Sequence, residues 1–433
     1  MRRRYALVGA GARAGMFVRA LAVAHADRAE LVALADVNQT RMDAHNRWLR
    51  ELGAPAVPTY AAADFAAMLA TERVDEVLVT TVDSTHADYI VAALHAGCDV
   101  VTEKPMTTDV EGCRRILGAV EETGRRVRVA FNYRYNPLHE AVRASLAAGE
   151  IGEVGSVHFE WLLDVRHGAD YFRRWHRDRA NSGGLLVHKS GHHFDLVNWW
   201  LAATPVTVYA DGRLFFYGES GRRHGYARDY ERAHGAAAAA GDPFAVRLAD
   251  NPMLRALYLD AEADDGYRRD VNVFGPGVTI DDDLAVLVRY STGATMTYHL
   301  TAYAPWEGYR VMVNGSRGRL ELEVVESDHV SPAGAADVKG TPGAAAAERG
   351  SATLTVRPLW APPREVPVPG YTRGGHGGAD ARMTAVLFGG VTDPMARSAT
   401  ARDGALALLT GLAANRSMAT GVPVPAADLL ETT

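Results

Sequence analysis

The sequence predicts an α/β protein of two domains, in which a doubly wound parallel sheet precedes a larger, mostly antiparallel open sheet. In the first 130 residues, short apolar runs alternate with helix-like segments, the pattern of a parallel sheet covered on both faces. After about residue 150, long runs alternate apolar and polar side chains, which favours antiparallel strands with one wet face. At 433 residues, the chain is long enough for two separate cores.

The first domain is expected over residues 1–131. Its short apolar runs predict five strands, at 5–8, 30–36, 77–81, 99–102 and 127–131. Helical periodicity between them predicts helices at 16–26, 85–96 and 109–123. This alternation is the doubly wound arrangement.

The second domain is expected over residues 132–433. Long strands are predicted at 154–165, 283–290, 294–303 and 310–325, and helices at 190–201 and 401–418. Residues 212–277 are rich in Arg, Tyr and Asp with weak periodicity, which indicates an insertion, either a lid or a dimer arm. Residues 328–351 are rich in Ala, Gly and Pro and are expected to form a mobile surface loop.

Composition excludes several classes of protein. A net charge of −6 without a basic stripe argues against nucleic acid as a partner. The sequence contains no stretch of about 18 uncharged apolar residues, so no transmembrane helix is expected. The apolar stretch after the arginine-rich start is short and runs directly into a glycine turn, which favours a first strand over a signal peptide. Cys98 and Cys113 give no disulfide framework or metal-ligand spacing, so a reducing cytoplasm is expected.

A glycine-rich turn follows the first predicted strand. The run from Gly9 to Ala14 fits G-x-G-x-x-A: the first glycine makes the turn, the second admits a pyrophosphate, and the small third residue lets helix pack on strand. Asp36 ends the second strand 21 residues after Gly15, where its carboxylate can accept hydrogen bonds from an adenosine ribose and repel a 2′-phosphate. The predicted cofactor is therefore NAD; Arg41 lies near enough to keep NADP as the less favoured alternative. The expected contacts are Gly9, Gly11, Ala12, Arg13, Ala14 and Asp36.

Lysine is rare in this chain. Three of the 46 Lys and Arg residues are lysine, and Lys104 lies in Thr102-Glu103-Lys104-Pro105. An ammonium can lose its proton when it is desolvated or crowded by charge, whereas a guanidinium cannot. Lys104 is therefore predicted to serve proton chemistry. Lys189 is a candidate for substrate contact by the same rarity, with a solvated position at the helix edge as the alternative. Lys339, in the expected mobile loop, shows that rarity alone does not establish a role.

Further motifs follow in a characteristic order: Glu103-Lys104-Pro105, then Asn132 to Pro137, then Gly183-Gly184, then Gly191 to Asp195. Together with the glycine turn, they resemble the Gfo/Idh/MocA family, the glucose-fructose oxidoreductase and inositol dehydrogenase group. The resemblance covers roughly the first 200 residues well and the later sheet more loosely.

The resemblance implies an NAD-binding Rossmann domain followed by an α/β domain whose open sheet supports a homodimer or homotetramer. It implies pyranose, inositol or polyol substrates. It places Lys104 beside the nicotinamide and the substrate hydroxyl, often with a cis Lys-Pro bond, and makes His192 the proton acceptor. His188 stands where relatives often have an aspartate. The implied cofactor neighbours are Thr81, His86, Glu103, Lys104 and Asn132.

These roles suit alcohol oxidation, which removes a hydroxyl proton as the hydride leaves. The ordinary pKa of histidine is near working pH, and the nicotinamide cation would lower the pKa of Lys104. His188 and His192 are four residues apart and are expected to share a helix face, with His188 either catalytic or a packing residue. Their spacing also fits a zinc pair, but no strong third ligand is identifiable, so no metal is expected.

A run of aromatic and cationic residues, 171–176, precedes these histidines and suits a sugar ring with its hydroxyls; an aromatic loop packing on the sheet is the alternative. The substrate-contact candidates are Lys104, Arg134, Trp175, His176, His188, Lys189 and His192. The expected function is an NAD-dependent dehydrogenase of a sugar, glycoside or cyclitol. The alternatives are a glycosidase that uses NAD transiently, through oxidation, elimination, water addition and re-reduction, and a nucleotide-binding regulator without catalysis.

Overall fold

The computed structural model describes residues 2–331, 349–372 and 375–431. Most of the mobile loop expected at 328–351, including Lys339, lies outside the described residues. The chain divides into two compact units. The first comprises residues 1–132, 247–269 and 380–405, and the second comprises residues 133–246, 270–379 and 406–433.

The first unit is built on a seven-stranded sheet with the order β15-β6-β5-β4-β1-β2-β3. All pairs are parallel except the edge pair of β15 with β6, which is antiparallel. The sheet thus confirms the predicted doubly wound parallel domain. Its strands are β1 (Arg3–Val8), β2 (Ala29–Asp36), β3 (Thr59–Ala61), β4 (Glu76–Val79), β5 (Asp99–Thr102), β6 (Val127–Val129) and β15 (Ala399–Thr400).

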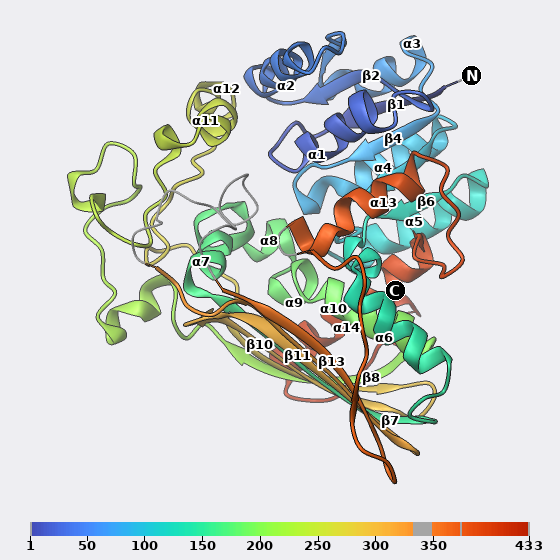
Figure 1. The fold of residues 1–433 in the computed structure, drawn as a ribbon. Helices are drawn as coiled ribbons and strands as arrows, with labels where there is room; N and C mark the ends of the chain where they lie inside the picture. Colours follow the sequence, from blue (N-terminus) through green and yellow to red (C-terminus); the bar gives the residue numbers. More distant parts are fainter. Residues whose placement is uncertain (1, 332–348, 373–374, 432–433) are drawn as a thin grey trace. The chain divides into compact units, whose positions relative to one another are not determined.

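The central strands of this sheet are mostly buried because helices cover both of its faces (Figure 1). A π-helical turn, Ala20–Ala24, continues α1, and a second one, Arg255–Leu259, joins α11 to the segment before α12. Side-chain caps begin two of the helices: Asn38 accepts from the Arg41 amide and Asp109 from the Gly112 amide. The helices are α1 (Ala14–Arg19), α2 (Gln39–Glu51), α3 (Phe65–Thr71), α4 (His86–His95), α5 (Val110–Thr123), α11 (Pro252–Leu254), α12 (Glu262–Asp265) and α13 (Ala379–Leu387).

Two segments of the first unit differ from the contiguous domains expected from the sequence. Residues 247–269, from the expected insertion, join this unit because Leu254 and Leu257 are buried in it, at 2% and 0% exposure. Residues 380–405 join it because Ala399 and Thr400 pair with β6. Both assignments depend on contacts between residues more than 100 positions apart, which no local pattern encodes.

The second unit is built on a nine-stranded sheet with the order β14-β13-β12-β11-β7-β10-β9-β8-β16. All pairs are antiparallel except β7 with β10, so the predicted mostly antiparallel sheet is confirmed. The strands are β7 (Val154–Asp164), β8 (Pro205–Arg213), β9 (Asp283–Tyr290), β10 (Thr295–Ala304), β11 (Glu307–Gly315), β12 (Gly318–Ser327), β13 (Ser351–Pro358), β14 (Arg364–Glu365) and β16 (Val424–Pro425).

The single strand expected at 310–325 is wrong, because this region is a hairpin of β11 and β12. Gly315 pairs with Gly318 across a two-residue loop. A Cβ on either glycine would lie within 2.6 Å of backbone atoms, so both positions require glycine. The polar, glycine-containing run 314–319 separates two alternating apolar stretches, so the sequence does carry a hairpin signal at this point.

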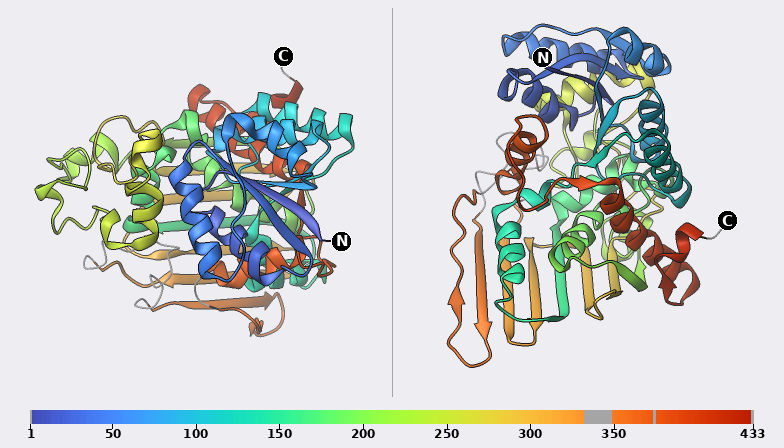
Figure 2. Two further views of the ribbon diagram at one scale, coloured as in Figure 1. Left: turned by 90° about the horizontal axis from the view of Figure 1, so that it is seen from above. Right: turned by 90° about the vertical axis from the view of Figure 1, so that its right-hand side faces the viewer.

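Helices of the second unit lie against one face of its sheet, and the opposite face carries none (Figures 1 and 2). The burial of β9 follows this arrangement, since buried and exposed residues alternate along it. The predicted C-terminal helix is confirmed as α14. The helices are α6 (Pro137–Ala147), α7 (Val165–Arg173), α8 (Arg179–Ser182), α9 (Leu185–His188), α10 (Gly191–Leu201), α14 (Ala401–Thr420) and α15 (Asp428–Glu431).

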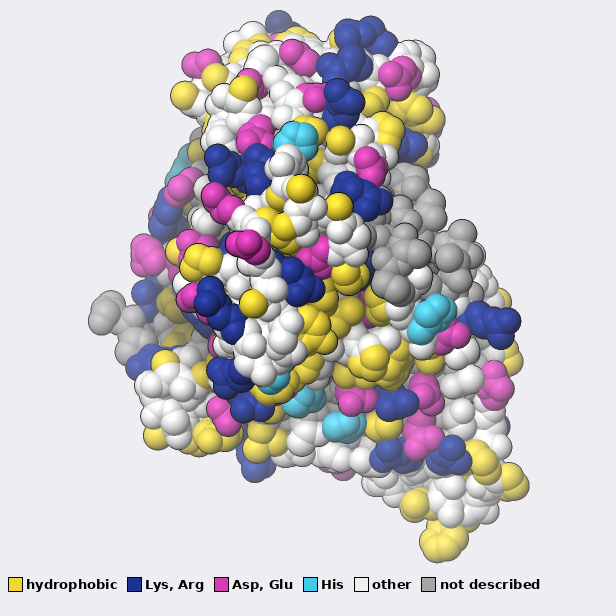
Figure 3. All heavy atoms as spheres, turned by 90° about the vertical axis from the view of Figure 1, so that its left-hand side faces the viewer, with side chains coloured by type: hydrophobic (Ala, Val, Ile, Leu, Met, Phe, Trp, Pro, Cys, Tyr) yellow, Lys and Arg dark blue, Asp and Glu magenta, His cyan; other side chains and the backbone are white. Residues whose placement is uncertain are grey.

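The surface carries charges of both signs. On the face in Figure 3, cationic and anionic side chains are interspersed and neither forms a continuous patch. Within the described part of the chain, no helix is both long and apolar enough to cross a membrane. Cys98 and Cys113 are buried free thiols.

Candidate active site

The first unit gathers its predicted site residues at one edge of the parallel sheet. Gly9 follows β1, Thr81 follows β4, and Lys104 follows β5, while Asp36 ends β2. Because these four strands are adjacent and parallel, their carboxyl ends share one edge. Ligands of open α/β sheets bind at this edge, where the strand order reverses. Along the strand order β2-β1-β4-β5, the carboxylate, the glycine turn and the lysine follow one another.

The glycine turn approaches β4 closely. A Cβ on Gly9 would lie 2.5 Å from the Thr80 carbonyl carbon and the Thr81 nitrogen, and its φ is +96°. Thr80 fixes the contact, since its hydroxyl donates to the Gly9 carbonyl at 2.6 Å. The turn therefore needs glycine for both conformation and space. The residues present fit a dinucleotide pyrophosphate.

Asp36 is buried beside this turn at 8% exposure. It accepts hydrogen bonds from the amides of Ala10 at 2.5 Å and Asn38 at 2.8 Å. Burial raises its pKa, although these bonds and Arg41 oppose the shift. Arg41 Nη1 lies 3.9 Å from Asp36 and only 2.7 Å from Asp265. Arg41, the cation that left NADP as an alternative cofactor, is thus paired with a second carboxylate.

The segment carrying Lys104 is held against the loop after β4. The Lys104–Pro105 peptide bond is cis, as the family resemblance implies. Fully buried His86 contacts the Pro105 carbonyl with Nδ1 at 2.8 Å and the Thr81 carbonyl with Nε2 at 3.2 Å. Burial lowers the pKa of His86, and the shorter contact favours donation from Nδ1. His86 therefore positions the lysine segment; its predicted contact with the cofactor stays a prediction.

Glu103 belongs to a chain of polar contacts within the first unit. It pairs with Arg13 Nε at 2.5 Å and accepts from the Lys104 amide at 3.2 Å. Asp380 binds Arg13 through two contacts of 3.2 Å and accepts from Asn132 Nδ2 at 2.8 Å. Asp380 and four predicted site residues are thereby joined, so that the glycine turn, the lysine segment and Asn132 share one network.

In the second unit, His192 lies in an aromatic environment. Its ring stacks on Tyr133 with centroids 4.4 Å apart and planes 14° apart. Lys189 Nζ donates to the Tyr133 hydroxyl at 3.1 Å and lies 4.6 Å from the Trp161 ring centroid. Burial raises the pKa of Tyr133 well above its ordinary value, so its hydroxyl stays protonated. Tyr133 thus links the predicted base to the second lysine.

The expectation that His188 and His192 share one helix is wrong. α9 ends at His188 and α10 begins at Gly191, with Lys189 and Ser190 between them. His188 instead contacts the ring of His176, with centroids 4.1 Å apart, and His176 stacks on Trp175 at 3.6 Å. Four predicted substrate-contact residues therefore fall into two pairs, His188 with His176 and His192 with Lys189, each with its own aromatic partner.

Arg134 forms a buried ion pair with Asp195. Its Nε and Nη2 donate to the two carboxylate oxygens of Asp195 at 2.7 and 2.6 Å. The two side chains are 3% and 1% exposed. This bidentate pair fixes the Asn132–Tyr135 turn to α10, which carries His192. A direct contact of Arg134 with substrate stays a prediction beside this structural role.

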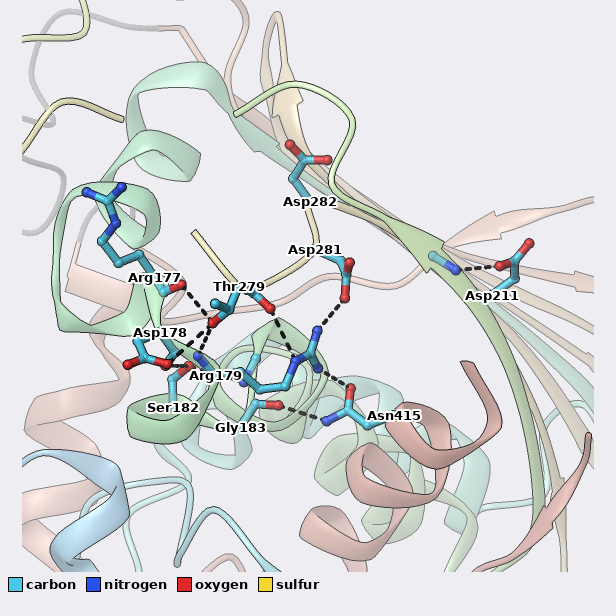
Figure 4. Close-up of polar contacts among 12 residues, drawn as sticks. Arg177, Asp178, Arg179, Ser182, Gly183, Asp211, Thr279, Asp281, Asp282 and Asn415 are labelled. Atoms are coloured by element: carbon cyan, nitrogen blue, oxygen red, sulfur yellow. Dashed lines mark hydrogen bonds and ion pairs between the residues drawn. The ribbon is translucent and has the colours of Figure 1, made fainter. Parts of the chain in front are cut away.

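A second polar network braces the glycine turn before α9 (Figure 4). Arg179 bonds to Asp281 at 2.5 Å, to Asn415 at 3.0 Å and to the Thr279 carbonyl at 3.3 Å. Asn415 in turn donates to the Gly183 carbonyl at 2.8 Å. Gly183 and Gly184 have φ of +70° and +82°, values that glycine adopts without strain. The network therefore fixes the start of the histidine segment.

Among the described residues, no group of three or more His, Cys, Asp or Glu side chains is arranged to hold a metal ion. Four residues of the sites were not predicted from the sequence: Tyr133, Tyr258, Asp265 and Asp380. Tyr133 lies between Asn132 and Arg134 in the 132–137 motif, and this position in the sequence could have identified it as a site residue. The other three come from segments without periodicity, and only the fold brings them to the site.

These features define a two-domain oxidoreductase with a nucleotide-binding Rossmann domain. Residues 3–131 match the oxidoreductase family's NAD-binding Rossmann fold, and residues 143–426 match its C-terminal alpha/beta domain. The chain belongs to the Gfo/Idh/MocA family.

Two relatives illustrate this membership. The chain is 34% identical to the YteT protein of Bacillus subtilis (strain 168), which is named only as an oxidoreductase, over 96% of each sequence. It is 34% identical to the inositol 2-dehydrogenase of Rhizobium meliloti (strain 1021), over 48% of this chain and 57% of that enzyme.

Solved structures share the fold. The WlbA dehydrogenase of Bordetella pertussis, crystallised with NADH and UDP-GlcNAcA, matches with a TM-score of 0.63 and 20% identity, over 98% of this chain and 99% of that one. An oxidoreductase domain protein of Kribbella flavida matches with a TM-score of 0.66 and 19% identity over the same shares.

Proposed function

We propose that this protein is an NAD-dependent oxidoreductase that removes a hydride from a ring hydroxyl of a sugar, glycoside or cyclitol. Several relatives carry names of this kind, including inositol 2-dehydrogenases and the D-xylose 1-dehydrogenase (NADP(+)) 2 of Haloferax volcanii. The proposal extends their chemistry to this chain. Preference for NAD over NADP is part of it.

The order of residues along the carboxyl edge of the parallel sheet is the observation that carries the proposal. Asp36 suits a ribose, the glycine turn suits a pyrophosphate, and Lys104 follows at the next strand but one. A dinucleotide laid along this edge would present its nicotinamide end toward Lys104. A lysine at that end is suited to proton transfer with a reacting hydroxyl.

In the proposed reaction, bound NAD would supply the hydride acceptor. His192 would take the proton of the substrate hydroxyl, and Lys104 would donate to or relay from the same oxygen. His188, His176, Trp175 and Lys189 would contact the sugar, since aromatic faces and ammonium donors suit a ring with hydroxyls.

A panel of sugars, glycosides and inositols, each mixed with protein and NAD, tests the proposal. The expected result is formation of NADH together with a keto product or lactone for at least one class of substrate. Binding of NAD measured by calorimetry accompanies the panel. Absence of NAD binding would overturn the cofactor assignment, and NAD binding without turnover on any polyol would overturn the substrate class.

The glycosidase alternative also has an observation in its favour. Residues 247–269 pack within the nucleotide-binding unit, and Tyr258 reaches the glycine turn, an arrangement suited to retaining a cofactor. In such an enzyme, NAD would return to its starting state after each turnover. Release of aglycone from a glycoside without net NADH would favour the glycosidase, whereas NADH formed in proportion to product would favour the dehydrogenase.

We also propose a homo-oligomeric, cytoplasmic protein. The face of the antiparallel sheet that carries no helix exposes Val206, Tyr209 and Leu287 by 42%, 42% and 47%, which suits burial against a second copy. Two buried free thiols suit a reducing compartment. Sedimentation of the purified chain as a monomer would contradict the oligomer.

A further inference from the structure

Residues 247–269 dock onto the start of α2, next to the predicted cofactor site. Asn38 Nδ2 donates to the Ala261 carbonyl at 2.8 Å, and Arg41 Nε donates to the Leu257 carbonyl at 2.9 Å. Asp264 accepts from the Thr40 amide at 2.9 Å. The segment is thus fixed by three hydrogen bonds to residues just beyond Asp36, the residue expected to bind ribose.

Tyr258 of this segment reaches the glycine turn itself. Its hydroxyl accepts a hydrogen bond from the Ala12 amide at 3.1 Å and would lie 3.7 Å from a Cβ on Gly11. The side chain is nearly buried, at 6% exposure. The amide it contacts belongs to the turn that receives the pyrophosphate in dinucleotide-binding folds. A phenol at this point can donate its own proton to a phosphate oxygen.

The same segment determines the surroundings of Arg41. Asp265 Oδ2 lies 2.7 Å from Arg41 Nη1, and the two side chains are 15% and 10% exposed. The guanidinium lies near the rings of both Tyr258 and Tyr267, 5.6 and 5.8 Å from their centroids. Its Nη2 is buried and has no hydrogen-bond partner among the described residues. Nη1 of Arg41 is therefore paired with a carboxylate, while Nη2 retains an N–H donor without an acceptor among the described residues.

We propose that residues 247–269 are a cofactor-binding element: Tyr258 is a ligand of the dinucleotide pyrophosphate, and Asp265 enforces NAD over NADP by occupying Arg41. This inference rests on the proposed binding of NAD and adds two residues to that site. A guanidinium near the ribose favours a 2′-phosphate. Asp265 opposes this by pairing with Arg41 and by adding negative charge beside Asp36.

The pyrophosphate role is tested by Tyr258→Phe, which removes only the hydroxyl. Loss of a hydrogen bond to a charged phosphate is expected to weaken NAD binding about tenfold, with a faster dissociation rate. Calorimetry and stopped-flow fluorescence measure both without turnover. Tyr226→Phe is the matched control, since Tyr226 belongs to the second unit, where its ring stacks on Phe274. Unchanged or tighter NAD binding in Tyr258→Phe would overturn this role.

The specificity role is tested by Asp265→Asn, which keeps the size of the side chain and removes its charge. The affinity for NADP is expected to rise about tenfold, while that for NAD changes less than about threefold. Asp260→Asn is the control: it lies on the same segment, and its partner is Arg255 rather than Arg41. The double variant Arg41→Met with Asp265→Asn should lose the gain, because the gain requires the freed guanidinium.

The outcomes separate this inference from the proposed function. If the unmodified protein binds no NAD, the proposed function fails first. If it binds NAD and Asp265→Asn leaves the ratio of NADP to NAD affinity unchanged, the specificity role fails alone. Circular dichroism of each variant establishes that it is folded, and a gain in NADP affinity cannot result from unfolding.

Discussion

The two candidate sites are built from different materials. The nucleotide site of the first unit consists of main-chain turns, glycines and ion pairs at the ends of parallel strands. Gly9, Asp36 and Lys104 each follow or end a strand. The histidine site of the second unit is built from side chains packed on aromatic rings. His192 stacks on Tyr133, Lys189 lies near Trp161, and His176 stacks on Trp175.

The difference reflects what each site is proposed to bind. A dinucleotide presents phosphates and ribose hydroxyls of fixed geometry, which amides at strand ends and a carboxylate can match. A polyol ring presents both faces and edges, which suit aromatic side chains and a few polar groups. The first site is thus specified by backbone conformation, and the second by side-chain packing.

The largest expected effect comes from the two proposed proton-transfer groups. Lys104→Ala and His192→Ala are each expected to lower kcat about 10³-fold, since a positioned acid or base contributes about 10²–10⁴. NAD affinity should change little. Lys104→Arg should be nearly as inactive as Lys104→Ala, because a guanidinium does not release its proton. The control His95→Asn alters an exposed histidine of α4 and should retain full kcat. Near-normal turnover in either alanine variant would refute the assigned role.

The second largest effect is expected at the buried pair of Arg134 and Asp195, which fixes α10. Asp195→Asn leaves the Arg134 charge buried without its partner, which is expected to cost about 3–5 kcal/mol of unfolding free energy. Denaturant unfolding followed by tryptophan fluorescence measures the loss. Arg310→Gln removes a half-exposed cation that pairs with Glu160 and Glu323, and this control should cost less than about 1 kcal/mol. Equal losses in the two variants would contradict the special weight given to the buried pair.

Gly9→Ala examines the backbone-built site. The added Cβ meets the backbone of Thr80 and Thr81, just after β4, at 2.5 Å, so the turn must shift. NAD affinity is expected to fall about 30-fold through loss of amide contacts to the pyrophosphate. Gly53→Ala is a matched control: its φ is +77°, and a Cβ there meets nothing within 4 Å. The control should therefore show the cost of left-handed backbone alone, with NAD affinity retained. If Gly9→Ala binds NAD normally, the close approach of Gly9 to Thr80 and Thr81 is not required for NAD binding.

The smallest effect concerns pH and the packed site. Burial lowers the pKa of His139 to about 4, and its ring contacts the Tyr133 carbonyl and the Tyr309 hydroxyl, both at 2.8 Å. Folded His139 is neutral, whereas the unfolded residue gains a proton below about pH 6.5. Its contribution to stability is therefore complete above pH 6.5 and falls as pH decreases toward 4.

At pH 5.5, this linkage is expected to cost about 1 kcal/mol relative to pH 7. The measurement is unfolding free energy at both pH values for the unmodified protein and His139→Gln. The variant, although less stable overall, should lose about 1 kcal/mol less between pH 7 and 5.5. An identical pH dependence in both proteins would exclude His139 as the titrating group.

The sequence predicted the parts of the fold that depend on local pattern. Five of the seven strands in the nucleotide domain, the turn at Gly9 and the carboxylate at Asp36 were anticipated, because each is encoded within a few residues. The short edge strands β3 and β15 were not predicted. The hairpin at Gly315 and Gly318 was missed although a local signal exists, since the polar, glycine-containing run 314–319 interrupts the apolar alternation. The helix predicted at 190–201 begins close to the observed start of α10, and the error was to place His188 on the same helix face as His192.

By itself, the sequence determined the order of motifs, and with it the family, the dinucleotide turn and the rare lysine at Glu103-Lys104-Pro105. These are local signals, legible because backbone conformation constrains residue type. Only the tertiary structure decided that Arg41 is paired with Asp265, that Tyr258 reaches the Ala12 amide and that Arg134 is committed to Asp195. The partners in the first two contacts are more than 200 residues apart in the chain, and no periodicity relates them; burial and charge pairing brought them together.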